Sequence, residues 1–222
     1  MHIPDGILPA QICLGGYALT GLTTWFSLKQ INRCANPLEG VPRAALLTAA
    51  FFAASLLRIP LPPASVHFVL NGMLGVVLGY YAFPAILVGL GLQAIMFGHG
   101  GLSTYGVNAV IMGIPALVAA ALFRSRDRLF PAQAQTRWLT GSFAFMAGAS
   151  GVGLAALVFY SLVIFNLPAD LNAQAEQAAL TTLLVAHVPL MLLEGAFTAL
   201  LVLFLEKVKP ELLNLRRNTH SL

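Results

Sequence analysis

The uncharged stretch VHFVLNGMLGVVLGYYAFPAILVGLGLQAIMF, residues 66–97, decides the fold class of this protein. It contains no Asp, Glu, Lys or Arg, and a helix needs about 20 predominantly apolar residues to cross the hydrocarbon core of a bilayer. The sequence Tyr80-Tyr81-Ala82-Phe83-Pro84 forms a natural break in it, because proline interrupts the hydrogen bonding of a helix. The stretch therefore predicts a tight transmembrane hairpin of two short helices.

The rest of the chain has the same apolar character. Of its 222 residues, 58% are hydrophobic and 9% are charged, and the mean hydropathy is +0.82, whereas soluble domains carry about 25% charged residues. Further crossings are predicted by apolar runs between turn and charge signals, at residues 8–28, 43–58, 105–123, 138–165 and 180–205. With the hairpin, these runs predict an all-α polytopic membrane protein of about seven transmembrane helices.

The chain is expected to form one unit. We interpret residues 1–213 as a single integral membrane domain and residues 214–222 as a polar cytoplasmic tail. A polar loop that holds Pro168, Asp170 and Glu176 is expected before the last crossing. No stretch is long enough for a separate water-soluble catalytic or ATP-binding domain, so any energy source must lie in another protein.

Lys and Arg cluster beside the apolar runs, so the net charge of +4 is interpreted as a topology signal and not as a nucleic-acid site. With the N-terminus outside, every cation except Arg58 becomes cytoplasmic: Lys29, Arg33, Arg43, Arg124, Arg126, Arg128, Arg137, Lys207, Lys209, Arg216 and Arg217. We therefore predict a multi-pass protein of the cell inner or plasma membrane, with an extracytoplasmic N-terminus, a cytoplasmic C-terminus and lipid around it.

Ionisable groups inside membrane segments are rare and mark functional sites. Here they are His67, His99, His187 and Glu194, and His2 is added to them because hydropathy places it at the outer mouth with His67 and His99. The histidines are thus expected to gather on one face.

A histidine at position two can build a metal chelate. The Met1 α-amino nitrogen, the deprotonated His2 amide and His2 Nδ1 can close adjacent five- and six-membered rings around one ion. A fourth nitrogen, for which His67 is the candidate, would complete a square-planar site that suits Ni(II) or Cu(II), with Co(II) also admitted. The Pro4-Asp5-Gly6 turn could fold the terminus inward. The alternative is a histidine that stands at position two by chance.

Several motifs resemble one family of transporters: Met1-His2-Ile3-Pro4-Asp5-Gly6; Ser65-Val66-His67 with Asn71-Gly72; Phe97-Gly98-His99-Gly100-Gly101-Leu102-Ser103-Thr104; and His187-Val188-Pro189 with Glu194-Gly195. The chain is similar, over nearly its whole length, to the substrate-capture membrane component of energy-coupling-factor transporters for Ni2+ or Co2+, the CbiM/NikM family. It departs from many relatives near Asn108, where they have a second Asn just before the Met.

The resemblance implies a function, a ligand set and partners. It implies that the N-terminus inserts into the membrane body and that Met1, His2 and His67 hold transported Ni2+ or Co2+ for cobalamin or nickel metabolism. It implies a transmembrane coupling subunit, a pair of cytoplasmic ATPases and, in some members, a small two-span accessory protein. The chain itself is expected to be no enzyme and to hold no cofactor of its own.

Groups that orient the metal-binding imidazoles form a second set of candidates: Ser65, Asn71, Gln93, His99 and Ser103. Asn71 is expected on the same helical face as His67, and the Gln93 amide must find a partner within an apolar span. His99 has an equal alternative, which is hydrogen bonding to carbonyls of its glycine-rich loop.

His187 and Glu194 lie roughly 10 Å apart along one helix, too far to share an ion. We interpret them as structural groups in a packing network. The sharper alternative is a proton-coupled secondary metal transporter that uses both residues. A second alternative is a membrane enzyme or assembly factor whose histidines are structural.

Overall fold

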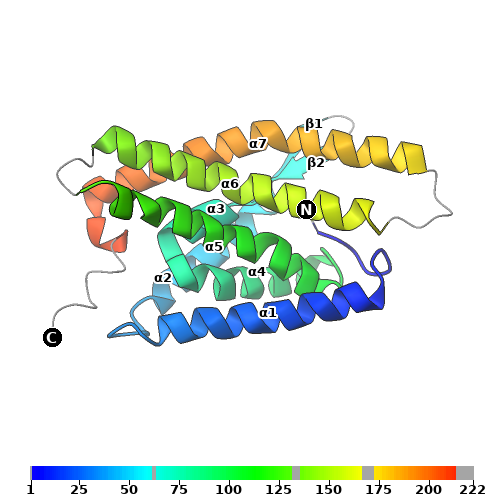
Figure 1. Ribbon diagram of the computed structural model, residues 1–222, viewed down its shortest axis with the longest axis horizontal. Helices are drawn as coiled ribbons and strands as arrows, with labels where there is room; N and C mark the ends of the chain where they lie inside the picture. The colour runs from blue at the N-terminus through cyan, green and yellow to red at the C-terminus, as the bar shows by residue number, and fades with distance from the viewer. Residues whose placement is uncertain (1, 62–63, 132–135, 167–172, 214–222) are drawn as a thin grey trace.

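The computed structural model describes residues 2–61, 64–131, 136–166 and 173–213 (Figure 1). Its elements, in chain order, are α1 (Ala10–Ile31), α2 (Val41–Ala54), β1 (Arg58–Leu61), β2 (Ala64–His67), α3 (Asn71–Leu78), η1 (Gly79–Tyr81), α4 (Ala82–Phe97), α5 (Tyr105–Leu129), α6 (Arg137–Ile164), α7 (Ala173–Val208) and η3 (Pro210–Leu212). The protein is a bundle of helices, which confirms the all-α fold, with one short β-hairpin added that the sequence pattern did not indicate.

The predicted transmembrane hairpin begins with α3, which lies inside the bundle. Asn71, the first residue of α3, donates to the Met112 carbonyl of α5 at 3.1 Å. About one turn later, Gly75 packs against the backbone of Ala116. Because both pairs advance in the same direction, α3 runs parallel to α5.

The second helix of the hairpin, α4, runs the opposite way. Its first turn packs Phe83 against Gly113 of α5, and further along the Tyr105 hydroxyl donates to the Leu87 carbonyl. The chain reverses at Gly79, whose φ of 60° lies in the left-handed region that glycine adopts without strain. The hairpin predicted from the apolar stretch is therefore confirmed, and Figure 1 shows its two helices running in opposite directions.

The sequence predicted one helix over residues 43–58, and this prediction is wrong. α2 ends at Ala54, and β1 then pairs antiparallel with β2, with Arg58 opposite His67. Pro60 has no N–H to continue a helix, and it favours an extended conformation in the residue before it. His67 consequently ends a strand, whereas we expected it to begin a helix.

Two other helices are longer than predicted. α7 begins at Ala173, so Glu176 lies in its first turn and not in a loop; an acidic residue there interacts favourably with the helix dipole. Pro168 and Asp170 lie outside the described residues. α5 continues through the basic sequence to Leu129, because Arg and Lys are good helix formers.

Some helical segments of the described chain are long and apolar enough to cross a membrane: residues 71–97, which are the folded hairpin, 105–129, 137–164 and 175–208. α1 has 22 residues, about 33 Å at 1.5 Å per residue. α2 is shorter, at 14 residues. The protein is therefore a multi-pass membrane protein, while the number of seven crossings and the orientation stay predictions.

The two ends of the bundle differ. In Figure 1 the segments that follow α1, α5 and α7 lie at one end, and the loop between α4 and α5 lies at the other. Most of the Lys and Arg residues lie in the last turns of these three helices or directly after them: Lys29, Arg33, Arg124, Arg126, Arg128, Lys207 and Lys209. This separation agrees with the charge pattern from which the orientation was predicted.

Small residues let α3 approach its neighbours closely. A Cβ added at Gly75 would overlap the Ala116 carbonyl, and one at Gly72 would meet the Gly148 carbonyl oxygen at 2.6 Å. Backbone contacts of this kind are typical of packed membrane helices. At these positions the glycines serve helix packing.

We expect Gly75→Ala to destabilise the protein, because α3 and α5 must separate to admit the methyl group. Overpacking of this kind costs typically about 1–3 kcal/mol. Thermal unfolding in detergent measures the effect. Gly21→Ala is the matched control, since a Cβ there meets nothing within 4 Å and alanine favours the helix. Equal melting temperatures for the two variants would contradict this account of the packing.

Candidate metal centre

The segment that precedes α1 turns back into the bundle instead of extending away from it (Figure 1). Asp5 and Gly6 form a turn in which Gly6 has a φ of 86°, a conformation that favours glycine. On the N-terminal side of the turn, the Ile3 side chain is 1% exposed. The inward fold predicted from the Pro4-Asp5-Gly6 sequence is confirmed.

The backbone of Ile3 is held from both sides by α5. The Ile3 N–H donates to Asn108 Oδ1 at 2.9 Å, and Asn108 Nδ2 donates to the Ile3 carbonyl at 3.0 Å. The Thr104 hydroxyl donates to the same carbonyl at 2.6 Å. Asn108 is 3% exposed, so these bonds are sheltered from water. The residue next to His2 is thereby fixed in position.

Sequence reasoning missed this role of Asn108 and Thr104. A signal was present, because the two residues are four apart and so share one face of α5. An amide inside an apolar helix also requires a hydrogen-bonding partner. What the sequence could not indicate was that the partner is the backbone of residue 3, which is 105 positions away.

Asp5 makes a second attachment, to the loop before α5. Its carboxylate accepts from the backbone N–H groups of Leu102 and Ser103, at 3.1 and 2.9 Å, and from the Ser103 hydroxyl. The Ser103 hydroxyl, with these backbone bonds, lowers the pKa of Asp5 below its ordinary value. A Cβ at Gly101 would overlap Asp5, so the glycine-rich loop is what admits the N-terminal segment.

The fold brings three histidine rings together, as the sequence predicted. The His2 ring centroid lies 5.6 Å from that of His67, with the planes inclined by 28°, and 6.1 Å from that of His99. Burial lowers the pKa of His67 to about 3 and also lowers the pKa of His2 well below its ordinary value. Both imidazoles are therefore neutral at pH 7, the form that binds metal ions.

The tautomer of His67 leaves one nitrogen for an ion. Its Nδ1 lies 2.9 Å from the Phe68 carbonyl oxygen, which accepts but cannot donate, so Nδ1 carries the proton and Nε2 has the lone pair. Among the described residues, no group of three His, Cys, Asp or Glu side chains forms a metal site by itself. A site here therefore needs further nitrogen ligands from the backbone or the terminus.

The predicted orienting residues divide into two groups. Gln93 is fully buried and lies within electrostatic reach of His2, while its Nε2 donates to Ser55 Oγ at 3.0 Å. His2 Nε2 and Gln93 Oε1 are both buried without a hydrogen bond of ordinary geometry. His99 joins the cluster through its ring and through its N–H, which donates to the Gln93 carbonyl at 3.2 Å.

The other orienting candidates do not serve the imidazoles directly. Asn71 was expected to share a helical face with His67, but the two lie in different elements, and Asn71 donates to the Gly151 carbonyl at 3.0 Å as well as to α5. Ser103 holds Asp5. Ser65 belongs to β2 by its backbone, and its side chain lies outside the described residues, as does Met1.

His187 and Glu194 are not bonded to each other within the described chain. His187 Nδ1 donates to the Leu183 carbonyl of its own helix at 2.7 Å. The Glu194 carboxylate accepts from the backbone N–H groups of Val69 and Leu70. The structural interpretation of both residues fits these contacts, although as two separate attachments and not as one pair.

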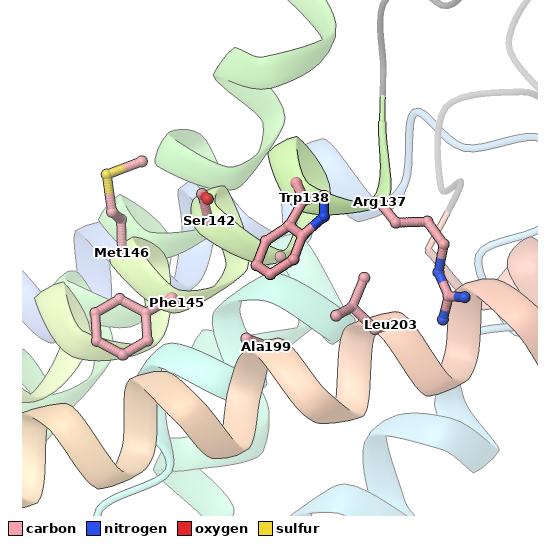
Figure 2. Close-up of a pocket in the computed structure, with 8 residues that line it drawn as sticks. Arg137, Trp138, Ser142, Phe145, Met146, Ala199 and Leu203 are labelled. Carbon is pink, nitrogen blue, oxygen red and sulfur yellow. The ribbon is translucent and has the colours of Figure 1, made fainter.

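A groove between α6 and α7, of about 590 Å³, lies away from the histidines. Figure 2 shows Trp138 and Phe145 from α6 and Ala199 and Leu203 from α7 around it. Its lining contains no His, Cys, Asp or Glu, the side chains that most often bind divalent transition metals. The histidine cluster remains the candidate site.

Comparison with known proteins gives a consistent result. The family described as "Cobalt uptake substrate-specific transmembrane region" matches residues 2–212. The chain is 36% identical over 219 residues to a protein of Haemophilus influenzae whose name assigns it to metal transport, covering 98% of this chain and 99% of that one.

Other relatives are named for particular metals. The chain is 32% identical to the fused nickel transport protein NikMN of Rhodobacter capsulatus, covering 98% of this chain and 65% of the relative. It is 30% identical to the cobalt transport protein CbiM of Geobacter sulfurreducens, with 96% and 61% covered. A crystal structure of a transition metal transporter has the same fold, with a TM-score of 0.75, 22% identity and both chains fully covered.

We expect Asn108→Ala to loosen the N-terminal segment, because it removes both bonds to the Ile3 backbone. An unsatisfied buried polar group costs about 1–3 kcal/mol, so hydrogen–deuterium exchange of the peptide covering residues 2–9 should accelerate about 10-fold or more. Asn32→Ala is the control, since Asn32 is exposed at the far end of α1. Exchange that is unchanged by Asn108→Ala would show that other contacts hold the segment.

Proposed function

The chain belongs to the CbiM/NikM family of cobalt- and nickel-uptake membrane components, and we propose that it captures extracytoplasmic Ni2+ or Co2+ and delivers it inward. The family is a metal-transport component and not an enzyme. In our proposal the energy comes from an energy-coupling-factor assembly, with a transmembrane coupling subunit, a pair of cytoplasmic ATPases and, as in some members, a small two-span accessory protein.

The observation that carries the proposal is the meeting of His2 and His67. Their rings come from sequence positions 65 apart and lie 5.6 Å from centroid to centroid, and burial keeps both neutral. A cluster of neutral imidazoles suits a borderline divalent transition metal and not Mg2+ or Ca2+, which prefer oxygen ligands.

The proposed ligands are four nitrogens. Met1 supplies the terminal amine, His2 supplies its deprotonated amide and Nδ1, and His67 supplies Nε2. With His2 Nδ1 on the ion, the proton of that ring lies on Nε2, which can donate a hydrogen bond to Gln93 Oε1. An orienting bond of this kind is usual for metal-binding histidines.

The proton-coupled alternative has less support. It would use the ionisable side chains of His187 and Glu194, yet each is already engaged by backbone groups. Both carboxylate oxygens of Glu194 accept backbone N–H donors, and these contacts support a structural role.

We expect a one-residue N-terminal extension to abolish high-affinity metal binding, because it displaces the amine and breaks the adjacent chelate rings. Purified protein is titrated anaerobically with Ni2+, Co2+, Cu2+ and Zn2+ while the d–d absorption spectrum is recorded. A diamagnetic square-planar Ni2+ spectrum that is lost in His2→Ala and in His67→Ala supports the proposed ligands.

The control for these titrations is intact mass, which must show Met1 as the mature terminus. Asn32→Ala serves as an unrelated surface variant and should bind as the parent does. Tight binding retained by the extended protein, or by both histidine variants, would overturn the ligand set and move the secondary-transporter reading to first place.

We expect metal affinity to fall as the pH falls, because protons compete for the ligand nitrogens. The terminal amine has an ordinary pKa of about 7.7–8.0, and the amide also loses a proton on binding, so affinity should fall by up to about 100-fold per pH unit below that range. The His67 imidazole adds nothing until far lower pH, since its pKa is about 3, and burial also lowers the pKa of His2. Titrations from pH 6 to 9 measure the slope, and a flat profile would contradict the amine and amide ligands.

A further inference from the structure

We propose that Glu194 is a positioning residue for His67, and that the carboxylate on α7 decides whether the last ligand of the metal site is in place. This inference rests on the proposed function, since it concerns the same site. Glu194 belongs to no proposed ligand set. Its role follows from where its two oxygens are bound.

The Glu194 carboxylate grips the backbone just beyond His67. It accepts from the N–H of Val69 and, at 2.7 Å, from the N–H of Leu70. The carboxylate is enclosed, since Glu194 is 1% exposed and Val69 is fully buried. Within the described chain no Lys, Arg or His forms an ion pair with it. The two N–H groups are therefore the hydrogen-bond donors that this side chain meets in the interior.

The backbone N–H groups of Val69 and Leu70 need hydrogen-bond acceptors from another part of the protein. α3 begins at Asn71 in the interior, so the N–H groups before it have no partner within their own helix. Leu70 has a φ of 51°, in the left-handed region that a leucine rarely adopts. A carboxylate at this helix start supplies two acceptors and complements the helix dipole. Without it, two donors would be buried unsatisfied.

The hydrogen bonds of Glu194 are connected to the His67 imidazole through a short series of contacts. Val69 is two residues after His67, and the His67 ring is itself tied to the intervening residue, because its Nδ1 donates to the Phe68 carbonyl at 2.9 Å. A shift of the carboxylate therefore moves the backbone at 69 and 70, then the carbonyl, then the ring. The ring also faces His2 at 5.6 Å, so a displacement would open the site.

This series of contacts begins at α7, which is itself held firmly in the bundle. The Glu194 carbonyl accepts from the Thr198 hydroxyl at 2.7 Å, and a Cβ at Gly195 would meet the Phe145 carbonyl oxygen at 2.9 Å. α7 is thus seated closely on α6 at the level of Glu194. The position of His67 is set by a helix that contributes no ligand.

The test is metal titration of Glu194→Gln with its native N-terminus. The amide keeps the size of the side chain, but one acceptor becomes an NH2 donor that faces an N–H donor. We expect the affinity for Ni2+ to fall about 10- to 100-fold, as for other residues that orient ligands. We also expect the Ni2+ absorption spectrum to shift toward that of His67→Ala, which a loss of stability alone would not cause.

Glu206→Gln is the matched control. It is the same substitution on the same helix, about 18 Å further along at 1.5 Å per residue, and its carboxylate accepts from Thr140 at the other end of the bundle. It should bind Ni2+ as the parent does. In the double variant Glu194→Gln with His67→Ala, the loss should not exceed that of His67→Ala alone, because there is no ring left to position.

The outcomes separate this inference from the proposed function. A parent protein that binds neither Ni2+ nor Co2+ refutes the proposed function. A parent that binds, beside a Glu194→Gln variant with unchanged affinity and spectrum, refutes the inference alone, as do additive losses in the double variant. Should Glu194→Gln not fold, Glu194→Asp decides: it keeps the charge with a shorter reach, so intermediate affinity is expected and parental affinity would overturn the role.

Discussion

In an apolar interior every backbone N–H and C=O must find a partner within the protein, because hydrocarbon offers none. Helices meet this constraint by themselves, but this chain brings two non-helical segments into its bundle. One is the N-terminal segment, where Asn108 satisfies both backbone groups of Ile3. The other precedes α3, where Glu194 satisfies two N–H groups. A few buried polar side chains thus determine where irregular backbone can run, and the rest of the structure is arranged around them.

The candidate metal centre lies where these two segments meet. His2 is next to the clamped Ile3, and His67 is two residues before the backbone that Glu194 holds, so the bonds that satisfy the backbone also place two imidazoles 5.6 Å apart. Partial burial keeps the rings of His2 and His67 neutral. In the proposed ligand set, irregular backbone supplies a nitrogen ligand that a regular helix could not offer, since helical amides are already hydrogen-bonded. Helices α5 and α7 supply the rigidity that these segments lack.

Close helix packing makes the arrangement feasible. The reversal at Gly79 lets α3 begin in the interior and not at the membrane surface. Gly75 allows α3 to lie against the backbone of α5, which brings its start within reach of α7. Because the helices are in direct backbone contact at these small residues, a displacement of one helix also displaces its neighbours. The helix that bears Glu194 is therefore mechanically connected to the segment that bears His67.

The sequence by itself determined the fold class, the hairpin at residues 66–97, the inward turn of the terminus and the gathering of histidines, because each depends on local composition and on glycine or proline at known positions. It could not determine that β1 and β2 pair with each other, since a short proline-rich segment is equally typical of a loop without strands. Nor could it assign partners to Asn108 and Glu194. A polar residue in an apolar stretch indicates that a hydrogen-bonding partner is needed. The partner, however, is a backbone group far along the chain, and only the packing of the helices brings the two within hydrogen-bonding distance.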